Sequence, residues 1–202
     1  MEKEINILNL ANLFEISNDS QMNSYIASYP YLLNYFSNFD EISAENVVCG
    51  THMVYGWMPT ILDLRRKKIS YEKAGEILTN AKKEKKISLD DLNNLSGLIN
   101  NSLVGASKLL HFIQPNFFPI WDSKICSFVT GRKTPSDKKS HDAYLDFIDW
   151  IKREKESKSF REAHKQIEKT LNEHQEKEKM QKYSVTTVRA VELAIFCAAR
   201  QM

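Results

Sequence analysis

Apolar residues along the chain recur three and four positions apart, and stretches that alternate apolar and polar residues are nearly absent. This spacing gathers apolar side chains on one face of an α-helix, whereas a half-buried strand needs alternation. Serines able to cap a helix precede three of these stretches: Ser43 before 44–56, Ser70 before 71–85, and Ser88 before 89–103. Asp91 follows Ser88 at the spacing of a capping box. The pattern predicts an all-α fold of about six or more helices joined by short connections.

The second half of the chain adds a loop and three further helical patterns. Residues 131–141 combine glycine, proline and serine with several cations and predict an exposed loop. Tyr144, Phe147, Ile148 and Ile151 share one face of an amphipathic helix. A mixed-charge run over 152–182 predicts a solvated helix, and the apolar stretch 185–200 predicts a buried one.

Length and composition bound the class of protein. A chain of 202 residues with 42% hydrophobic residues can bury a sizeable core, and we expect one compact all-α domain over 1–202, with possible lobes 1–87 and 88–202. Nothing approaches the ~20 apolar residues of a membrane helix, and the start lacks a signal-peptide pattern, so we expect a cytoplasmic protein without membrane contact. Cys49, Cys126 and Cys197 lie far apart without a CxxC pair. We therefore expect no disulfide framework, no metal site and no cofactor.

Charge is distributed unevenly although the net charge is only +2. No Lys or Arg occurs between Lys3 and Arg65, while residues 65–86 are rich in cations. Two groups are candidates for binding nucleic-acid phosphates: Arg65, Arg66, Lys67 and Lys68 in the first, and Arg132 and Lys133 in the predicted loop. A polyanion is therefore expected to bind the cation-rich region that begins at Arg65 and to avoid the region between Lys3 and Arg65.

Residues 107–125 hold the densest set of candidate chemical groups. A bend at Gly105 is expected to start a helix on which Lys108, His111 and Phe112 share a face. The helix dipole and partial burial would lower the pKa of a lysine in the first turn and make its amine a better nucleophile. Prolines then keep the chain extended as far as Asp122, which is placed to cap the next helix.

This arrangement of a glycine turn, a lysine, an apolar segment and an aspartate opening a helix resembles the helix-hairpin-helix DNA glycosylase superfamily, which includes endonuclease III and the 8-oxoguanine glycosylases. The resemblance covers about residues 88–130, and its hairpin is degenerate, because Gly105 alone remains of the family's glycines. It implies that Lys108 forms a Schiff base with the sugar of a flipped nucleotide and that Asp122 stabilises the developing positive charge. Only these two residues carry over from the family.

Two functions are compatible with these observations. The first is a base-excision glycosylase of DNA repair that hydrolyses the base from double-stranded DNA, with Lys108 and Asp122 catalytic and with Trp57, Phe118 or Trp121 stacking on the displaced base. His111 would also lie at that nucleic-acid site. The alternative is a non-catalytic module on the same scaffold that binds nucleic acid, or a protein through a Tyr-rich N-terminal region containing Tyr25, Tyr29, Tyr31, Tyr35, Phe36 and Phe39. In that case Asp122 is only a helix cap, and the aromatic residues belong to the core.

Overall fold

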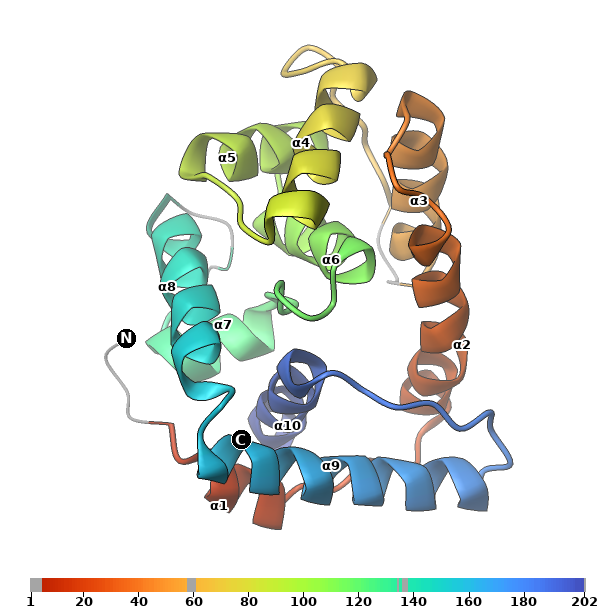
Figure 1. The fold of residues 1–202 in the computed structure, drawn as a ribbon, viewed down its shortest axis with the longest axis vertical. Helices are drawn as coiled ribbons and strands as arrows, with labels where there is room; N and C mark the ends of the chain where they lie inside the picture. The colour runs from red at the N-terminus through yellow and green to blue at the C-terminus, as the bar shows by residue number, and fades with distance from the viewer. Residues whose placement is uncertain (1–4, 58–60, 134, 136–137, 202) are drawn as a thin grey trace.

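The computed structural model describes residues 5–57, 61–133, 135 and 138–201. Within these residues the fold is all-helical, as predicted, and one isolated bridge between Leu64 and Ile99 is the sole strand-like pairing. The helices shown in Figure 1 are α1 (Ile7–Asn12), α2 (Ser20–Ser37), α3 (Ala44–Gly56), α4 (Tyr71–Glu84), α5 (Leu89–Leu98), α6 (Leu103–Ile113), α7 (Ser123–Thr130), α8 (Lys138–Glu154), α9 (Lys158–Lys177) and α10 (Thr187–Gln201). No helix in the described part of the chain has the length and apolar character needed to cross a bilayer.

The three predicted serine caps are present at the starts of α3, α4 and α5. The reciprocal capping box forms at Ser43 and Asn46, however, whereas the Asp91 carboxylate accepts a hydrogen bond from the hydroxyl of Ser88. The predicted helix 89–103 is too long, because α5 ends at Leu98 and the two asparagines after Ile99 adopt left-handed backbone angles, with φ of 54° and 52°. Asparagine tolerates this conformation better than most residues.

The start of α6 corrects the expected bend at Gly105. The helix begins at Leu103, and the Ser102 side chain accepts the backbone N–H of Gly105 at 3.4 Å. Gly105 lies inside the helix, where an added Cβ would collide with the Tyr55 hydroxyl and with Ile99. The glycine permits a close approach of α3 to α6, and no glycine hairpin precedes the lysine. Lys108 therefore lies in the second helical turn, beyond the strongest effect of the helix dipole.

The helices pack around α6 and α10. Helix α6 contacts α2, α3, α4 and α5, while α10 contacts α1, α7 and α9. Helix α5 packs on α6 and α8, and α7 packs on α10. Figure 1 shows α1 beside α9, so segments from the two ends of the chain meet. One cluster of buried apolar side chains includes members from every helix of the described residues.

Helices of the second half follow the predicted patterns with shifted bounds: α8 continues to Glu154, α9 covers only Lys158–Lys177 of the predicted helix 152–182, and α10 begins at Thr187. Helix α8 begins at Lys138, so the predicted loop 131–141 is shorter at its C-terminal end, and His141 is buried with Nε2 3.1 Å from the Ser96 hydroxyl. Helix α9 buries Phe160, Ile167 and Leu171 and exposes its charged face. The predicted burial of the last helix is confirmed for most of α10.

Candidate functional site

Lys108 and Asp122 line the same cavity, which has a volume of about 130 Å³. Trp57, Arg189 and Glu192 also line it, together with apolar side chains from α2 and α10. The lysine comes from α6, the aspartate from the start of α7, and the Arg–Glu pair from α10. The cavity is thus formed by segments that are far apart in the sequence.

Hydrogen bonds between Ser107 and Trp121 bring the two candidate catalytic residues together. The Trp121 backbone N–H donates to the Ser107 hydroxyl at 3.0 Å, and this hydroxyl lies 3.3 Å from the Trp121 carbonyl. Ser107 precedes Lys108, and Trp121 precedes Asp122. This contact fixes the register between α6 and the extended segment 118–122, so that the lysine and the aspartate face the same cavity.

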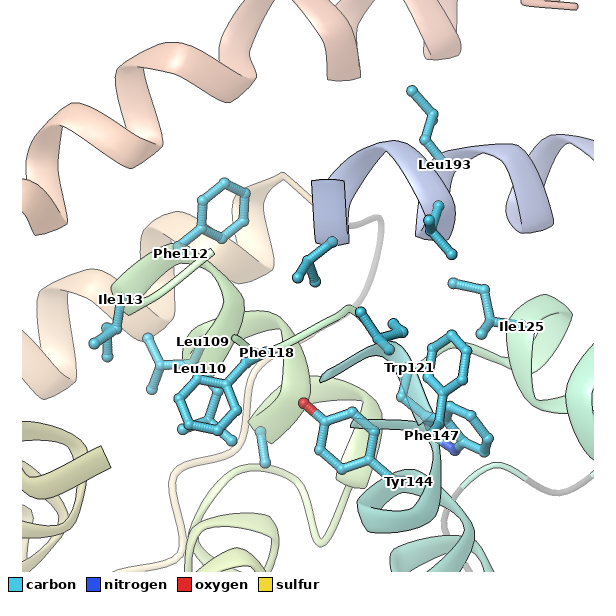
Figure 2. Close-up of a cluster of buried hydrophobic side chains, with 14 of the residues drawn as sticks. Leu109, Leu110, Phe112, Ile113, Phe118, Trp121, Ile125, Tyr144, Phe147 and Leu193 are labelled. Carbon is cyan, nitrogen blue, oxygen red and sulfur yellow. The ribbon is translucent and has the colours of Figure 1, made fainter. Parts of the chain in front are cut away.

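The rest of the extended segment is held by side chains from three helices. The Phe118 carbonyl lies 2.7 Å from His111 Nδ1, and the Pro119 carbonyl accepts the Tyr144 hydroxyl at 3.0 Å. The Ile120 N–H donates to Glu192 at 3.3 Å. Figure 2 shows the Tyr144 hydroxyl among the surrounding apolar side chains of this region. A buried backbone group without a partner is costly, and these bonds allow an extended segment to cross the core.

Lys108 is a partly buried amine with a lowered pKa. Burial lowers its pKa to about 8, against the opposing effects of the Asp122 and Glu192 carboxylates. Its Nζ lies 5.6 Å from the centroid of the Trp57 ring, a cation–π distance. The structure describes both side chains, and the Lys108 amine and the Asp122 carboxylate form no ion pair within 4.0 Å. The amine is therefore near a carboxylate without being neutralised by direct contact.

Asp122 is both a helix cap and a cavity residue. Its Oδ1 accepts the Ile125 backbone N–H at 2.8 Å, which confirms the predicted N-cap. Burial raises the pKa of this carboxyl group, while the hydrogen bond from Ile125 and the charge of Lys108 act in the opposite direction. Capping and lining the cavity, which the sequence presented as alternatives, coexist in one side chain.

Arg189 and Glu192 complete the site and were not anticipated from the sequence. They form a buried ion pair on one face of α10, and the Arg189 guanidinium also lies 4.8 Å from the centroid of the Tyr29 ring. Burial raises the pKa of Glu192 to about 7, and Arg189 opposes this effect. The available signal was a pair of opposite charges three residues apart in an otherwise apolar helix, because buried charges need partners.

His111 has a structural role in this arrangement. Burial lowers its pKa to about 3, so the ring is neutral. Since the Phe118 carbonyl can only accept a hydrogen bond, Nδ1 of His111 carries the hydrogen. Nε2 therefore accepts the hydrogen bond from the Tyr29 hydroxyl, and these two atoms are 2.8 Å apart. The ring links α2, α6 and the extended segment.

Three residues expected to contact nucleic acid are buried. His111, Phe118 and Trp121 each have 0% exposure, so their side chains present no surface to a nucleic acid. Trp121 instead packs on Tyr144 and Phe147 (Figure 2). Its ring centroid is 5.9 Å from that of Tyr144 and 5.6 Å from that of Phe147. Of the aromatic candidates, only the half-buried Trp57 lines the cavity.

The first predicted cationic group lies away from the cavity. Figure 1 places the segment that leads into α4, which includes residues 65–68, at the upper end of the molecule, and α10 in its lower half. Arg65 pairs with Asp63 at 2.7 Å, and Arg66 lies 5.0 Å from the Tyr71 ring centroid. Lys67 and Lys68 are exposed.

The second cationic group follows α7. Lys133 is exposed, and Arg132 lines a different cavity of about 280 Å³ together with Lys139, Asp142 and Asp146. Asp122 and Arg132 flank opposite ends of the eight-residue helix α7, so roughly 12 Å of helix separates this group from the candidate site.

The Tyr-rich N-terminal region is only partly available to a partner. Tyr29 and Phe36 are buried in the core, with 1% and 0% exposure, which corrects their assignment to a contact surface. Tyr25 and Tyr35 are half-buried, as is Phe39, whereas Tyr31 is 66% exposed. The residues alternate between core and surface because α2 lies on the body of the protein along one face.

Comparisons of this chain with known protein families, with curated proteins and with solved structures found no match. Among the described residues, no group of three His, Cys, Asp or Glu side chains lies close enough to hold a metal ion. A functional assignment therefore depends on the cavity and on the chemistry of Lys108, Asp122, Arg189 and Glu192.

Proposed function

We propose that the protein is a base-excision DNA glycosylase, in which Lys108 attacks the sugar of a flipped nucleotide. The observation that supports this best is the lowered pKa of Lys108, about 8, in a cavity shared with Asp122. At pH 7 roughly a tenth of such an amine is neutral, whereas an ordinary lysine, with a pKa of about 10.4, is almost entirely charged. An amine activated in this way is suited to forming a Schiff base.

The proposed reaction uses both candidate catalytic residues. The neutral Lys108 amine forms a bond to sugar C1′ while the C1′–base bond breaks, and the base leaves with the electron pair of that bond and takes a proton. The nitrogen of the lysine loses a proton, and opening of the sugar ring, with a proton taken up by its ring oxygen, gives the Schiff base. The ionised Asp122 carboxylate stabilises the positive charge that develops on the sugar.

Binding of double-stranded DNA would use the two cationic groups. The exposed side chains of Lys67, Lys68 and Lys133 are suited to phosphate contacts, and Trp57 offers an aromatic face at the cavity. A nucleotide would have to leave the duplex to reach Lys108, since this side chain lines a cavity below the protein surface.

Borohydride trapping on duplex DNA with an abasic site tests the proposal. Borohydride reduces a Schiff base to a stable amine, so the wild type should give a covalent protein–DNA adduct that Lys108→Ala abolishes. Lys124→Ala is the matched control, because Lys124 is an exposed lysine two residues after Asp122. Absence of an adduct with the wild type, or an adduct that survives in Lys108→Ala, would contradict the proposed reaction.

One observation favours the alternative of a non-catalytic DNA-binding module. The cations at 65–68 lie at the end of the molecule away from α10, and Arg65 is already paired with Asp63. A module of this kind would bind DNA equally well in the wild type and in Lys108→Ala, and neither protein would form an adduct. Binding and trapping measured on the same two proteins therefore distinguish the two functions.

A further inference from the structure

We infer that a groove between α2 and α3, next to the cavity, is the site that receives the base of the flipped nucleotide. The inference rests on the proposed function, because it assigns the reacting sugar to the cavity and the base to the groove. The groove has a volume of about 540 Å³. Its walls include Gln21, Ser24, Tyr25, Tyr31, Met53 and Trp57.

The groove and the cavity share two wall residues. Tyr25 and Trp57 line both, and their ring centroids are 5.1 Å apart. The Trp57 indole N–H donates to the Tyr25 carbonyl at 3.3 Å, which fixes the ring at this boundary. Because Lys108 Nζ lies 5.6 Å from the Trp57 ring centroid on the cavity side, the two spaces meet beside the candidate nucleophile.

The volumes of the cavity and the groove decide which of them can hold the sugar and which the base. An enclosed cavity of ~150 Å³ holds one benzene-sized ring, so the cavity of about 130 Å³ cannot hold a base together with its sugar. The groove lies within the ~300–1,000 Å³ range of small-molecule sites. A sugar at the cavity entrance would direct its base along the groove.

The chemistry of the groove suits a nucleobase. Among the described residues, its wall is aromatic, apolar or uncharged polar and contains no Lys, Arg, Asp or Glu. The exposed Tyr31 ring and the half-buried Trp57 ring offer faces for stacking, and the exposed Gln21 amide can donate and accept at a base edge. A flat, uncharged ring system with hydrogen-bonding edges matches this wall, whereas a phosphate finds no cation here.

The experiment compares two duplexes that differ only in the presence of one base. One carries an unpaired, bulged adenosine, and the other carries an abasic nucleotide at the same position. The wild type should bind the first about tenfold more tightly, since stacking of one base on an aromatic side chain gives an effect of this order. Tyr31→Ala and Gln21→Ala should each reduce this ratio.

Leu89→Ala is the control, because Leu89 is a 40% exposed apolar residue at the start of α5 and outside the groove. Its ratio should equal that of the wild type. A wild-type ratio of one, or a ratio kept by both groove variants, would overturn the inference. Borohydride trapping on the abasic duplex reports on the Lys108 reaction without any base, so its failure would identify a fault in the proposed function instead.

Adenosine alone provides a probe that requires no DNA binding. It should quench the fluorescence of the half-buried Trp57, and Trp57→Phe should remove this quenching while the fully buried Trp121 remains unaffected. A peptide-binding groove would give no quenching by adenosine and no dependence on the bulged base, which would favour a protein partner.

Discussion

At the residue scale, Asp122 caps α7 and has a proposed catalytic role, and replacing it by asparagine separates the two. Asparagine caps helices about as well as aspartate, so Asp122→Asn should change the free energy of unfolding by less than about 0.5 kcal/mol, whereas Asp122→Ala should lose about 1 kcal/mol. Both variants lack the carboxylate that we propose stabilises the cationic transition state, so base release should fall by about 10²–10³-fold under the proposed function. Urea unfolding and single-turnover base release measure the two effects.

An Asp122→Asn protein that releases base at the wild-type rate would restrict this residue to its capping role. A large loss of stability in Asp122→Asn would instead show that the charge itself supports the fold. The wild-type hydrogen bond from Ile125 to Oδ1 is 2.8 Å long, and an asparagine oxygen can accept it equally.

Lys108 is expected to cost stability at neutral pH. Its folded-state pKa is about 8 against an ordinary value of 10.5, so below pH 8 the folded protein carries an unfavourably buried charge. Lys108→Met should raise the free energy of unfolding at pH 7 by about 1–2 kcal/mol, less than the full shift implies because water reaches part of the site. Between pH 8 and 10.5 the unfolded chain binds more protons, so the wild type gains stability and the difference should shrink.

Denaturant unfolding of the two proteins from pH 7 to pH 10 tests this dependence, with Lys124→Met as the exposed control. A difference that stays constant across the range would show that Lys108 is not protonated against a penalty. If the neutral Lys108 amine is the nucleophile, as proposed, trapping by the wild type should increase with pH, reach half of its maximum near pH 8 and level off above it.

Sequence reasoning found part of this site and missed part. Asp122 was recognisable because an aspartate directly before a helical pattern is a local signal. Arg189 and Glu192 were missed because their helix was identified only by its apolar character. Their position in the wall of the cavity depends on how α10 packs against α7. The neutral state of His111 likewise depends on burial, which one sequence does not specify.

At the scale of elements, Ser107 connects α6 to the extended segment. Ser107→Ala would leave the buried Trp121 N–H without its hydroxyl partner, and we expect a loss of about 1–3 kcal/mol. Ser37→Ala is the matched control, because its exposed hydroxyl bonds only to a carbonyl of its own helix. Equal changes in the two variants, measured by urea unfolding, would contradict this role of Ser107.

Replacing Gly105 tests whether the close approach of α3 and α6 requires a glycine. Alanine normally stabilises a helix relative to glycine, but a Cβ here would collide with the Tyr55 hydroxyl and with Ile99. Gly105→Ala should therefore lower the free energy of unfolding by about 1–3 kcal/mol. Gly56→Ala, at the end of α3 where an added Cβ meets no atom of the described residues within 4 Å, should be neutral or slightly stabilising. Thermal unfolding of both variants decides between packing and helix propensity.

The predicted elements succeeded where local signals control them. Serine caps gave correct starts for three helices, because a cap acts within a few residues of itself. The end of α5 and the start of α6 were missed, since leucine spacing continues across the left-handed Asn100 and Asn101. The role of Gly105 could not be read from its neighbours, because the residues that require it belong to other parts of the chain.

At the scale of the whole molecule, the position of the cations makes salt dependence informative. Each phosphate contact lowers the logarithm of the binding constant by about 0.9 per tenfold increase in salt. Replacing Arg65, Arg66, Lys67 and Lys68 by alanine should reduce this slope by up to about 3–4. The charge-matched control replaces Lys158, Lys165, Lys169 and Lys177 of α9. Fluorescence anisotropy at several salt concentrations gives both slopes, and equal slopes would exclude residues 65–68 from the proposed DNA interface.

The way in which the extended segment 118–122 is held affects how its sequence can diverge. Ser107, His111, Tyr144 and Glu192 all bind main-chain atoms of this segment. Two of these atoms are carbonyl oxygens, which every amino acid provides, and two are N–H groups, which every amino acid except proline provides. Buried side chains such as Phe118 and Trp121 need only fill their volume, so other apolar residues can replace them over evolutionary time. Distant relatives of this chain would then share the four anchoring side chains, spread over three helices, more faithfully than the conspicuous aromatic stretch between them.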